Sequence, residues 1–334
     1  MSDAPGATAS EIEAAAAALR AGELVAFPTE TVYGLGADAR QREALRRIYA
    51  LKGRPSSHPL ILHIGELAEL SQWVREVPDE VGALAARFWP GPLTLVLARA
   101  PGVLDELTGG QDSIAVRMPS HPVARALLAA FGSGIAAPSA NRYGHVSPTC
   151  AAHVREEFPH GLRILEGGAC EVGLESTILS FIGGEPRLLR PGVIGRRALE
   201  QVLARALATD EPAERSAIPR VPGSTIAHYA PDTPLQLIPG DTLERSVHEQ
   251  LARGERVAVL ARRAAPAGLP AGVCVWLAAP QTAGAFGQAL YANLRTLDKS
   301  GAGTLLVESV PSDETWEAVR DRLTRAAAGS SRAD

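Results

Sequence analysis

The stretch LKGRPSSHPLILHI, residues 51–64, places two cations on a turn directly before a short apolar strand. Lys52 and Arg54 flank a glycine and are followed by Pro55, a pattern typical of a turn. The run PLILHI is almost wholly apolar and is predicted to be a buried strand. Loops held by rigid strands often carry binding groups, but they also carry ordinary solvated charges. Taken alone, a solvated turn is the better interpretation, so the rest of the chain has to decide.

Strands and helices alternate on both sides of this stretch. Upstream we expect a helix that Ser10 caps and that ends near Gly22, then a strand in ELVAFPT and a glycine-containing turn in TVYGLGADA. Further helices are predicted over residues 41–51, 78–89, 121–132 and 195–207, and from Ser147-Pro148 onward. The predicted strands are LTLVLA, SIAVRMP, GIAAPSA, RILEGG, ESTILSF and PRLLRPGVI. Because strands dominate the later part, the fold class is α/β with a twisted, mixed sheet.

Residues 208–233 interrupt this alternation, since they lack periodicity and are rich in Pro, Ser and Thr. The pattern then restarts with the strands LQLI, RVAVLA, VCVWLA and TLLVES and with helices over 241–253, 281–298 and 313–327. This restart predicts a small parallel α/β domain of Rossmann-like type. The predicted organisation is a first domain over 1–207, a linker over 208–233 and a second domain over 234–334.

The composition is that of an ordinary globular protein. The 334 residues are 46% hydrophobic and 21% charged, and the formal net charge is −4. An acidic balance argues against a generally basic nucleic-acid binder, although a local cationic cleft remains compatible with it. Three cysteines without metal-binding spacing indicate reduced thiols. No secretion signal and no membrane-length apolar run are present, so we expect a cytoplasmic protein.

Common nucleotide and hydrolase motifs do not explain the chain. GLGADA, residues 34–39, fits the G-x-G-x-x-A dinucleotide fingerprint, but the expected acidic residue is missing from the segment 54–60. Its glycines are more simply explained by a tight turn. The sequence has no P-loop, no H-E-x-x-H and no G-x-S-x-G motif.

Polar side chains instead recur at the ends of the predicted strands. Arg117 stands alone in the apolar strand IAVRMP, and a buried guanidinium has to meet an acid from the protein or from a ligand. The other members of this set are Thr29, Thr31, Tyr33, Lys52, Arg54, His63, Ser139, Asn141, Ser176, Thr177 and Arg190. Cations with hydroxyl donors and few carboxylates predict an anion-binding cleft for phosphates and a carboxylate. Without a nucleophile beside a general base, such a set supports catalysis by positioning and charge neutralisation of a phosphoryl group.

Seven ordered segments resemble a known family, the YrdC-type threonylcarbamoyl-AMP synthases. They are FPTETVYGLGADA, YALKGRPSSHPLILHI, FWPGPLTLVL, IAVRMPSHP, APSANRYGHVSPT, GLESTILSF and LLRPGVI, and they cover about residues 10–205. The K-x-R and S-x-N pairs, here Lys52/Arg54 and Ser139/Asn141, are the family's signature. The tail, with PGSTIAHYAP before a small α/β domain, is similar to the long, two-domain branch.

The resemblance implies a fold, a reaction and partners. The fold would be a twisted α/β sheet with a concave, cationic face. The reaction would convert L-threonine, bicarbonate and ATP into L-threonylcarbamoyl-adenylate and pyrophosphate, for the threonylcarbamoyladenosine modification of tRNA. Mg²⁺ would accompany ATP and bridge its phosphates, but no metal ligand can be assigned. The downstream tRNA threonylcarbamoyl transferase machinery would be a partner, and direct tRNA contact is left open.

The resemblance also assigns roles by position. Lys52 and Arg54 would be the catalytic pair that holds the ATP phosphates, Lys52 as a point charge and Arg54 as a fork. The other residues facing ATP would be His58, Ser113, Asn141, Thr149, Arg190 and, from the linker, His228. The threonine pocket would be formed by Thr31, His63, Arg117, Ser139 and Ser176. The linker would act as a lid over the site.

Two alternatives remain open from the sequence. One is an RNA-binding module that uses a cationic concave face and catalyses nothing, which would show salt-sensitive RNA affinity without ATP turnover. The other is a related adenylating or carbamoyl-transferring enzyme with another substrate.

Overall fold

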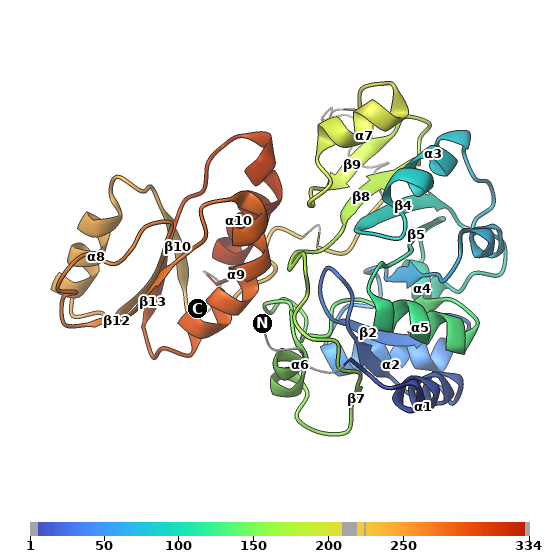
Figure 1. Ribbon diagram of the computed structural model, residues 1–334, viewed down its shortest axis with the longest axis horizontal. Coiled ribbons are helices and arrows are strands. Elements are labelled where there is room, and N and C mark those ends of the chain that lie inside the picture. The colour runs from blue at the N-terminus through green and yellow to red at the C-terminus, as the bar shows by residue number, and fades with distance from the viewer. Residues whose placement is uncertain (1–5, 209–218, 224, 331–334) are drawn as a thin grey trace. The chain divides into compact units, whose positions relative to one another are not determined.

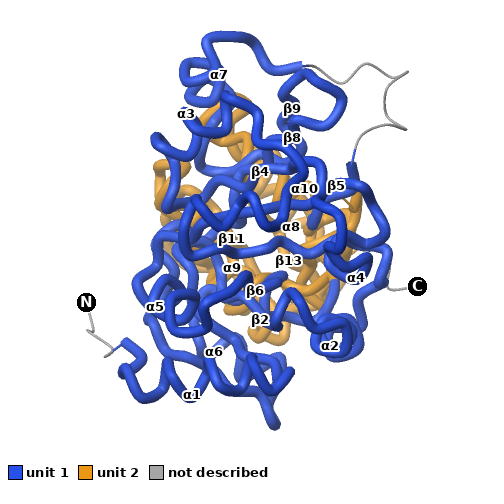
Figure 2. Tube along the Cα trace, turned by 90° about the vertical axis from the view of Figure 1, so that its right-hand side faces the viewer, with its two compact units in different colours: residues 1–143, 148–224 blue, residues 144–147, 225–334 orange. Residues whose placement is uncertain are grey.

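The computed structural model describes residues 6–208, 219–223 and 225–330. The chain forms two compact units, Met1–Tyr143 with Pro148–Ser224 and Gly144–Ser147 with Thr225–Asp334, which Figure 2 colours separately. The linker predicted for 208–233 contributes residues to both units, and its positions 209–218 and 224 lie outside the described residues. Each unit is described by itself.

The first unit is built on a nine-stranded mixed sheet, which confirms the predicted fold class. The strand order is β7-β1-β2-β6-β3-β5-β4-β8-β9, with the pairs β7–β1, β3–β5 and β4–β8 parallel and the others antiparallel. The strands are β1 Val25–Phe27, β2 Gly34–Asp38, β3 Ile61–His63, β4 Leu93–Ala98, β5 Ser113–Arg117, β6 Ile135–Ala136, β7 Arg163–Ile164, β8 Thr177–Ser180 and β9 Arg187–Arg190.

The helices of this unit cover the sheet unequally. They are α1 Ala9–Arg20, α2 Arg42–Lys52, α3 Asp79–Phe88, α4 Asp105–Thr108, α5 Pro122–Phe131, α6 Ala151–Glu157 and α7 Arg196–Leu203, with a 3₁₀ turn, η1, at Leu67–Gln72. Alternate residues of the central strands, such as Leu62, Leu95 and Val116, join the large core against α2, α3 and α7. On the opposite face α1 and α5 pack side by side over β1 and β6 (Figure 1).

The remainder of this opposite face carries a smaller apolar cluster. Ile61, Val96, Ala115 and Ile178 pack there against Val221, which comes from the predicted linker. Strand side chains alternate between the two faces, so the polar residues His63, Thr94 and Arg117 lie on the side away from the large core. This face of the sheet therefore combines apolar residues with a row of polar ones.

The second unit contains a four-stranded parallel sheet of order β10-β13-β11-β12, as the sequence predicts. Its strands are β10 Leu235–Ile238, β11 Val257–Ala261, β12 Val273–Ala278 and β13 Thr304–Glu308. Its helices are α8 Leu243–Ala252, α9 Ala283–Asp298 and α10 Glu317–Ser330, preceded by the 3₁₀ turn η3, Glu314–Trp316. Leu243 and Val247 of α8 pack against Val257, Val259 and Leu306.

Three local expectations are wrong. The segment TVYGLGADA, expected to be a turn, contains the strand β2. Gly36 is needed within this strand because a Cβ there would lie 2.9 Å from the Phe27 ring and 3.0 Å from the Ile135 side chain. The glycine thus allows close strand packing. Helix α1 is capped by Thr8, which forms a capping box with Glu11, and not by Ser10.

The third difference concerns the start of α6. Ser147 and Pro148 do not begin a helix, and α6 starts at Ala151 after the cap residue Cys150. The Pro148 carbonyl accepts a hydrogen bond from the Tyr33 backbone N–H at 2.9 Å, so this segment is held beside the strand-end loop instead. In the part of the chain that the structure describes, none of the helices combines the length and apolar character required to span a bilayer.

Candidate active site

A row of polar side chains crosses three neighbouring strands of the first unit. His63 of β3 and Thr94 of β4 are both register partners of Arg117 on β5. Residues paired across a sheet point to the same face, so these three side chains lie next to one another. All three are buried, at 3%, 0% and 3% exposure. The sheet therefore delivers an imidazole, a guanidinium and a hydroxyl to one place.

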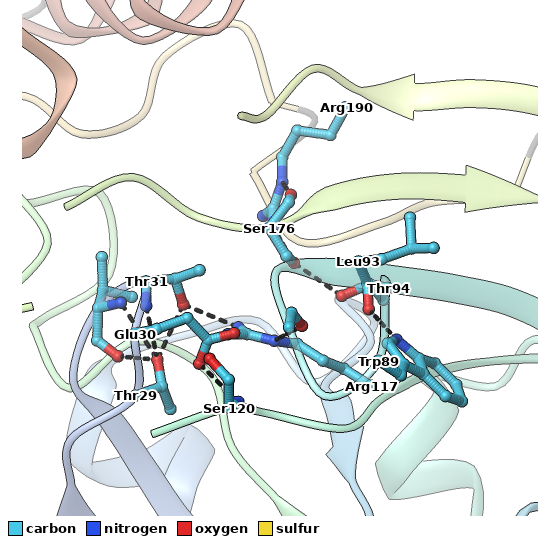
Figure 3. A network of polar contacts seen from close by, with 12 residues as sticks. Thr29, Glu30, Thr31, Trp89, Leu93, Thr94, Arg117, Ser120, Ser176 and Arg190 are labelled. Atoms are coloured by element: carbon cyan, nitrogen blue, oxygen red, sulfur yellow. Dashed lines mark hydrogen bonds and ion pairs between the residues drawn. The ribbon is translucent and has the colours of Figure 1, made fainter. Parts of the chain in front are cut away.

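Arg117 meets an acid from the protein. Its Nη2 lies 2.6 Å from the Glu30 Oε1, its Nη1 donates to the Thr31 hydroxyl at 2.8 Å, and its Nε donates to the Gly91 carbonyl at 3.3 Å (Figure 3). The sequence predicts that this guanidinium needs an acid or a ligand, and Glu30, from the loop after β1, supplies the acid. A paired guanidinium is tolerated in the strand because its desolvation is compensated.

Hydroxyl groups extend this network in two directions. The Thr29 and Thr31 hydroxyls lie 2.8 Å apart, and Thr29 also donates to the Val32 carbonyl. On the other side, the Thr94 and Ser176 hydroxyls lie 2.7 Å apart. Arg190 donates to the Ser176 hydroxyl at 3.1 Å and to its carbonyl at 2.9 Å. As Figure 3 shows, these contacts join residues of β4, β5 and β9 with residues of the loop after β1 and with Ser176, directly before β8, into one site.

His63 contributes a neutral imidazole to the row. Burial, with a smaller contribution from the Arg117 charge, lowers its pKa to about 3. Its Nδ1 lies 3.3 Å from the Ile61 carbonyl, which can only accept, so Nδ1 carries the proton of this bond. The imidazole therefore adds polarity near neutral pH without adding charge.

Lys52 joins the K-x-R loop to the S-x-N segment. Its Nζ donates to the Ser139 carbonyl at 2.6 Å and to the Asn141 carbonyl, and its own carbonyl accepts from Tyr143 N–H at 2.8 Å. Only 3% of the residue is exposed. Burial, followed by repulsion from Arg54, holds the pKa of Lys52 well below its usual value. These contacts show Lys52 organising the loop that carries Ser139 and Asn141.

Arg54 and His58 form a second, more cationic part of the site with Tyr143. Arg54 donates to the Pro59 carbonyl at 2.8 Å and lies 5.7 Å from the centre of the Tyr143 ring. His58 Nδ1 lies 3.2 Å from the Tyr143 hydroxyl. Burial lowers the pKa of His58, and the charges of Arg54 and Arg220 lower it further. Arg220 is held nearby by paired hydrogen bonds with Gln111 at 2.7 and 3.0 Å.

The remaining predicted residues fall into two groups. One group is buried in the first unit and consists of Ser113, Asn141, Thr149 and Arg190. Within it, Thr149 contacts His153, and Arg190 also donates to the Pro222 carbonyl at 2.8 Å. His228 belongs to the second unit, where its ring packs 4.2 Å from the Tyr229 ring. The structure thus gathers all predicted site residues except His228 within the first unit.

Two residues of the network are missing from the sequence-based site. Glu30 lies between two threonines in PTET, and its role depends on Arg117, which is distant in the chain. Thr94 is the polar residue within LTLVLA, and its place opposite Arg117 follows only from the sheet register. The sequence signal for Thr94 is the same as for Arg117, namely a polar residue inside an otherwise apolar strand.

Clusters of metal-binding side chains are absent from the residues that the structure describes. None of the groups of three or more His, Cys, Asp or Glu side chains in these ranges is arranged to hold a metal ion. Within the polar network, the Glu30 carboxylate is already engaged by Arg117 and by the Ser120 backbone N–H.

The chain is similar to known proteins over nearly its whole length. The family model described as "Telomere recombination" matches residues 17–192, and the model described as "Threonylcarbamoyl-AMP synthase, C-terminal domain" matches residues 194–328. The threonylcarbamoyl-AMP synthase of Bacillus subtilis is 39% identical over 326 residues, which are 96% of this chain and 93% of that protein. The enzyme of the same name from Pyrococcus abyssi is 38% identical over 324 residues, 95% of this chain and 94% of that protein.

The structural comparison agrees with the sequence comparison. The crystal structure of P. abyssi Sua5 complexed with L-threonine superimposes with a TM-score of 0.86 at 37% identity. The match covers 97% of this chain and 96% of that chain. Both units of the fold are therefore found together in a relative of nearly equal length.

Proposed function

Because the chain belongs to the two-domain threonylcarbamoyl-AMP synthase family, we propose that its buried polar network is the amino-acid half of the active site of such an enzyme. The protein is a nucleotidyltransferase that makes threonylcarbamoyl-AMP for the threonylcarbamoyladenosine modification of tRNA. The observation that carries the placement is the buried Arg117, bound to Glu30 and Thr31 and flanked by His63 and Thr94. Family membership favours this enzyme over the RNA-binding module.

L-Threonine would occupy the hydroxyl-rich end of the site. Arg117 retains N–H donors for the substrate carboxylate, since a guanidinium has five and three are engaged. The substrate hydroxyl would be bound among Thr31, His63 and Ser176, with Ser139 closing the pocket. This assignment is supported by the burial of the network, because desolvated charge-assisted hydrogen bonds discriminate strongly between ligands.

ATP would occupy the cationic end. Arg54 and His58 would contact its phosphates, with Ser113, Asn141, Thr149 and Arg190 facing the nucleotide and Lys52 holding the loops together. Mg²⁺ would be bound mainly by the ATP phosphates and water, since such sites commonly use few protein ligands. The repulsion among the cations around Arg54 supports this placement, because an anion bound there would relieve the repulsion that lowers the pKa of His58 and Lys52.

The reaction needs positioning more than covalent chemistry. The threonine amine condenses with bicarbonate to form an N-carboxylate, and the oxygen of the C–O bond that breaks leaves with the protons as water. This carboxylate attacks the α-phosphorus of ATP in line while pyrophosphate leaves. The protein would hold the two substrates in contact and neutralise the phosphate charge. Neutral His63 and the Arg117–Glu30 pair fit this role, since they orient a substrate without supplying a nucleophile.

The predicted linker would act as a lid that carries His228 toward the nucleotide. Its residues 219–223 are attached to the first unit, where Val221 packs on the sheet and the Pro222 carbonyl binds Arg190. Its residues 225–233 are attached to the second unit, where Tyr229 stacks on Tyr291. Gly223, at φ +75°, lies at the end of the first of these attachments, and its backbone freedom would suit a hinge.

Pyrophosphate release tests the proposed reaction. The protein should release pyrophosphate from ATP in the presence of bicarbonate and L-threonine, more slowly with serine and not without an amino acid. ATP hydrolysis that ignores threonine, or no turnover with purified substrates, would contradict the proposal. The cytoplasmic location and the hand-over of the product to a tRNA threonylcarbamoyl transferase follow from this function and are proposed with it.

A further inference from the structure

Glu30 is a buried carboxylate at the centre of the network. Its residue is 3% exposed, its Oε1 lies 2.6 Å from Arg117 Nη2, and its Oε2 accepts the Ser120 backbone N–H at 3.1 Å. Its own carbonyl accepts the Val172 N–H at 2.8 Å. Both the main chain and the side chain of Glu30 are therefore fixed, and Figure 3 shows its carboxylate beside the Arg117 guanidinium.

The charges around Glu30 and Arg117 are balanced. One carboxylate and one guanidinium lie side by side, His63 is neutral, and the neighbouring Thr29, Thr31, Thr94 and Ser176 contribute hydroxyl groups. A ligand that brought only a carboxylate would place a second negative charge against Glu30 in a desolvated site, which is costly. A ligand with one charge of each sign would satisfy both residues.

Both residues retain hydrogen-bonding capacity for such a ligand. Arg117 uses one N–H on each of Nε, Nη1 and Nη2, which leaves one donor on Nη1 and one on Nη2. These two donors can bind a carboxylate together. Each oxygen of Glu30 accepts one contact in the structure and has two lone pairs, so the carboxylate can accept further donors.

We propose that Glu30 binds the α-ammonium group of the amino-acid substrate while Arg117 binds its α-carboxylate, so that the pair recognises a zwitterion. This assignment rests on the proposed function and adds a substrate-binding residue to it. The ammonium and carboxylate of an α-amino acid are attached to a single carbon atom. Adjacent opposite charges on the protein match that arrangement, and they orient the amine relative to the rest of the site.

Calorimetric titration of the full-length protein with two ligands separates this role from mere support of Arg117. The ligands are L-threonine and its α-hydroxy acid analogue, in which a hydroxyl replaces the ammonium group. Glu30→Gln should weaken L-threonine binding about tenfold or more. It should not weaken the affinity for the hydroxy acid, and we expect it to increase that affinity, because this ligand carries no ammonium group and its carboxylate no longer faces the negative charge of Glu30.

The reciprocal variant and a control complete the experiment. Arg117→Gln should weaken both carboxylate ligands but not threoninamide, which lacks the carboxylate. Glu80→Gln, on α3, removes another arginine-paired glutamate, whose partner Arg205 lies 2.9 Å away, and this variant should bind both ligands like the unmodified protein. Equal losses for threonine and the hydroxy acid in Glu30→Gln, or no loss for either, would overturn the role of Glu30.

The unmodified protein provides a test that does not depend on folding of the variants. It should bind L-threonine at least about tenfold more tightly than the hydroxy acid, since the latter lacks the group that Glu30 binds. Equal affinities would overturn the inference while leaving the proposed function intact. A protein that binds no L-threonine at all would instead overturn the proposed function, and the inference with it.

Discussion

The threonine end and the ATP end of the proposed active site hold their buried cations differently. Arg117 has a carboxylate at 2.6 Å, whereas the hydrogen bonds of Lys52 go to the main-chain carbonyls of Ser139 and Asn141. A carboxylate cancels a full charge, but a carbonyl oxygen carries only a partial one. The first end is therefore close to neutral, while the second holds two neighbouring cations, Lys52 and Arg54, that repel each other. This difference matches a zwitterionic amino acid at one end and a polyanionic nucleotide at the other.

The pKa directions support this contrast. Repulsion from Arg54 lowers the pKa of both Lys52 and His58, after burial as the larger cause. A loop whose cations repel one another is stabilised when an anion binds. The threonine end does not require a bound anion for electrostatic stabilisation, because Arg117 is already paired with Glu30. Its residues can therefore be held in place before any substrate binds. The site thus has one preorganised end and one that becomes electrostatically satisfied with its ligand.

The largest effect is expected from breaking the charge pair. Arg117→Ala would leave Glu30 buried without its counter-ion, and loss of one partner of such a pair costs about 3–5 kcal/mol. We expect the free energy of unfolding in urea to fall by about this amount, and threonine-dependent pyrophosphate release to be lost. The double variant Arg117→Met with Glu30→Gln should recover stability but not activity. A single variant as stable as the unmodified protein would show that the pair is not buried as described.

The cationic end is tested by Lys52→Met, which keeps most of the side-chain volume and removes the ammonium group. Two buried carbonyls would lose their donor, so the Ser139–Asn141 segment should be less well positioned. We expect ATP affinity to fall about tenfold or more, corresponding to about 1.4 kcal/mol or more, with a smaller effect on threonine affinity. An equal loss for both ligands in titration calorimetry would remove the distinction between the two ends.

A pH dependence of stability distinguishes the neutral imidazole. The pKa of His63 is about 3 in the folded protein and 6.5 for an unperturbed histidine. Between these two pH values the unfolded state binds a proton at His63 that the folded state does not bind. Its contribution is present above about pH 6.5 and is lost as the pH falls toward about 3. We expect a loss of about 2 kcal/mol between about pH 7 and about pH 5 from this group. His63→Gln should show a correspondingly shallower decrease in urea unfolding, and an identical decrease would contradict a buried neutral His63.

The sequence predicts the elements of this fold better than the partners within the site. Strand LTLVLA and the parallel C-terminal sheet follow from local patterns, and their structural bounds agree with the prediction. The glycines of GLGADA favour a turn in the sequence, whereas in the structure Gly36 permits close packing between Phe27 and Ile135. Such packing depends on strands that are distant in sequence, which local patterns do not reveal.

The site shows the same limit. The isolated Arg117 in an apolar strand correctly required an acid, yet nothing local identified Glu30 as that acid. The sequence alone does not single out Thr94, because a threonine within a strand is common, and its place in the site follows only from its register with Arg117. The K-x-R and S-x-N pairs were recognised from their resemblance to a family, and the structure adds that Lys52 connects the two physically.

The smallest expected effect concerns Thr94 and tests whether the preorganised end extends beyond the charge pair. Thr94→Val keeps the shape of the side chain and removes the hydroxyl that lies 2.7 Å from the Ser176 hydroxyl. Loss of one buried hydrogen bond costs about 1 kcal/mol, and Ser176 keeps its contact with Arg190. We therefore expect a several-fold increase in the KM for threonine with little change in the KM for ATP. Because Ser176 touches Arg190, which is assigned to the nucleotide, a change in the ATP value of equal size would mean that the two ends share this hydroxyl network and are not independent.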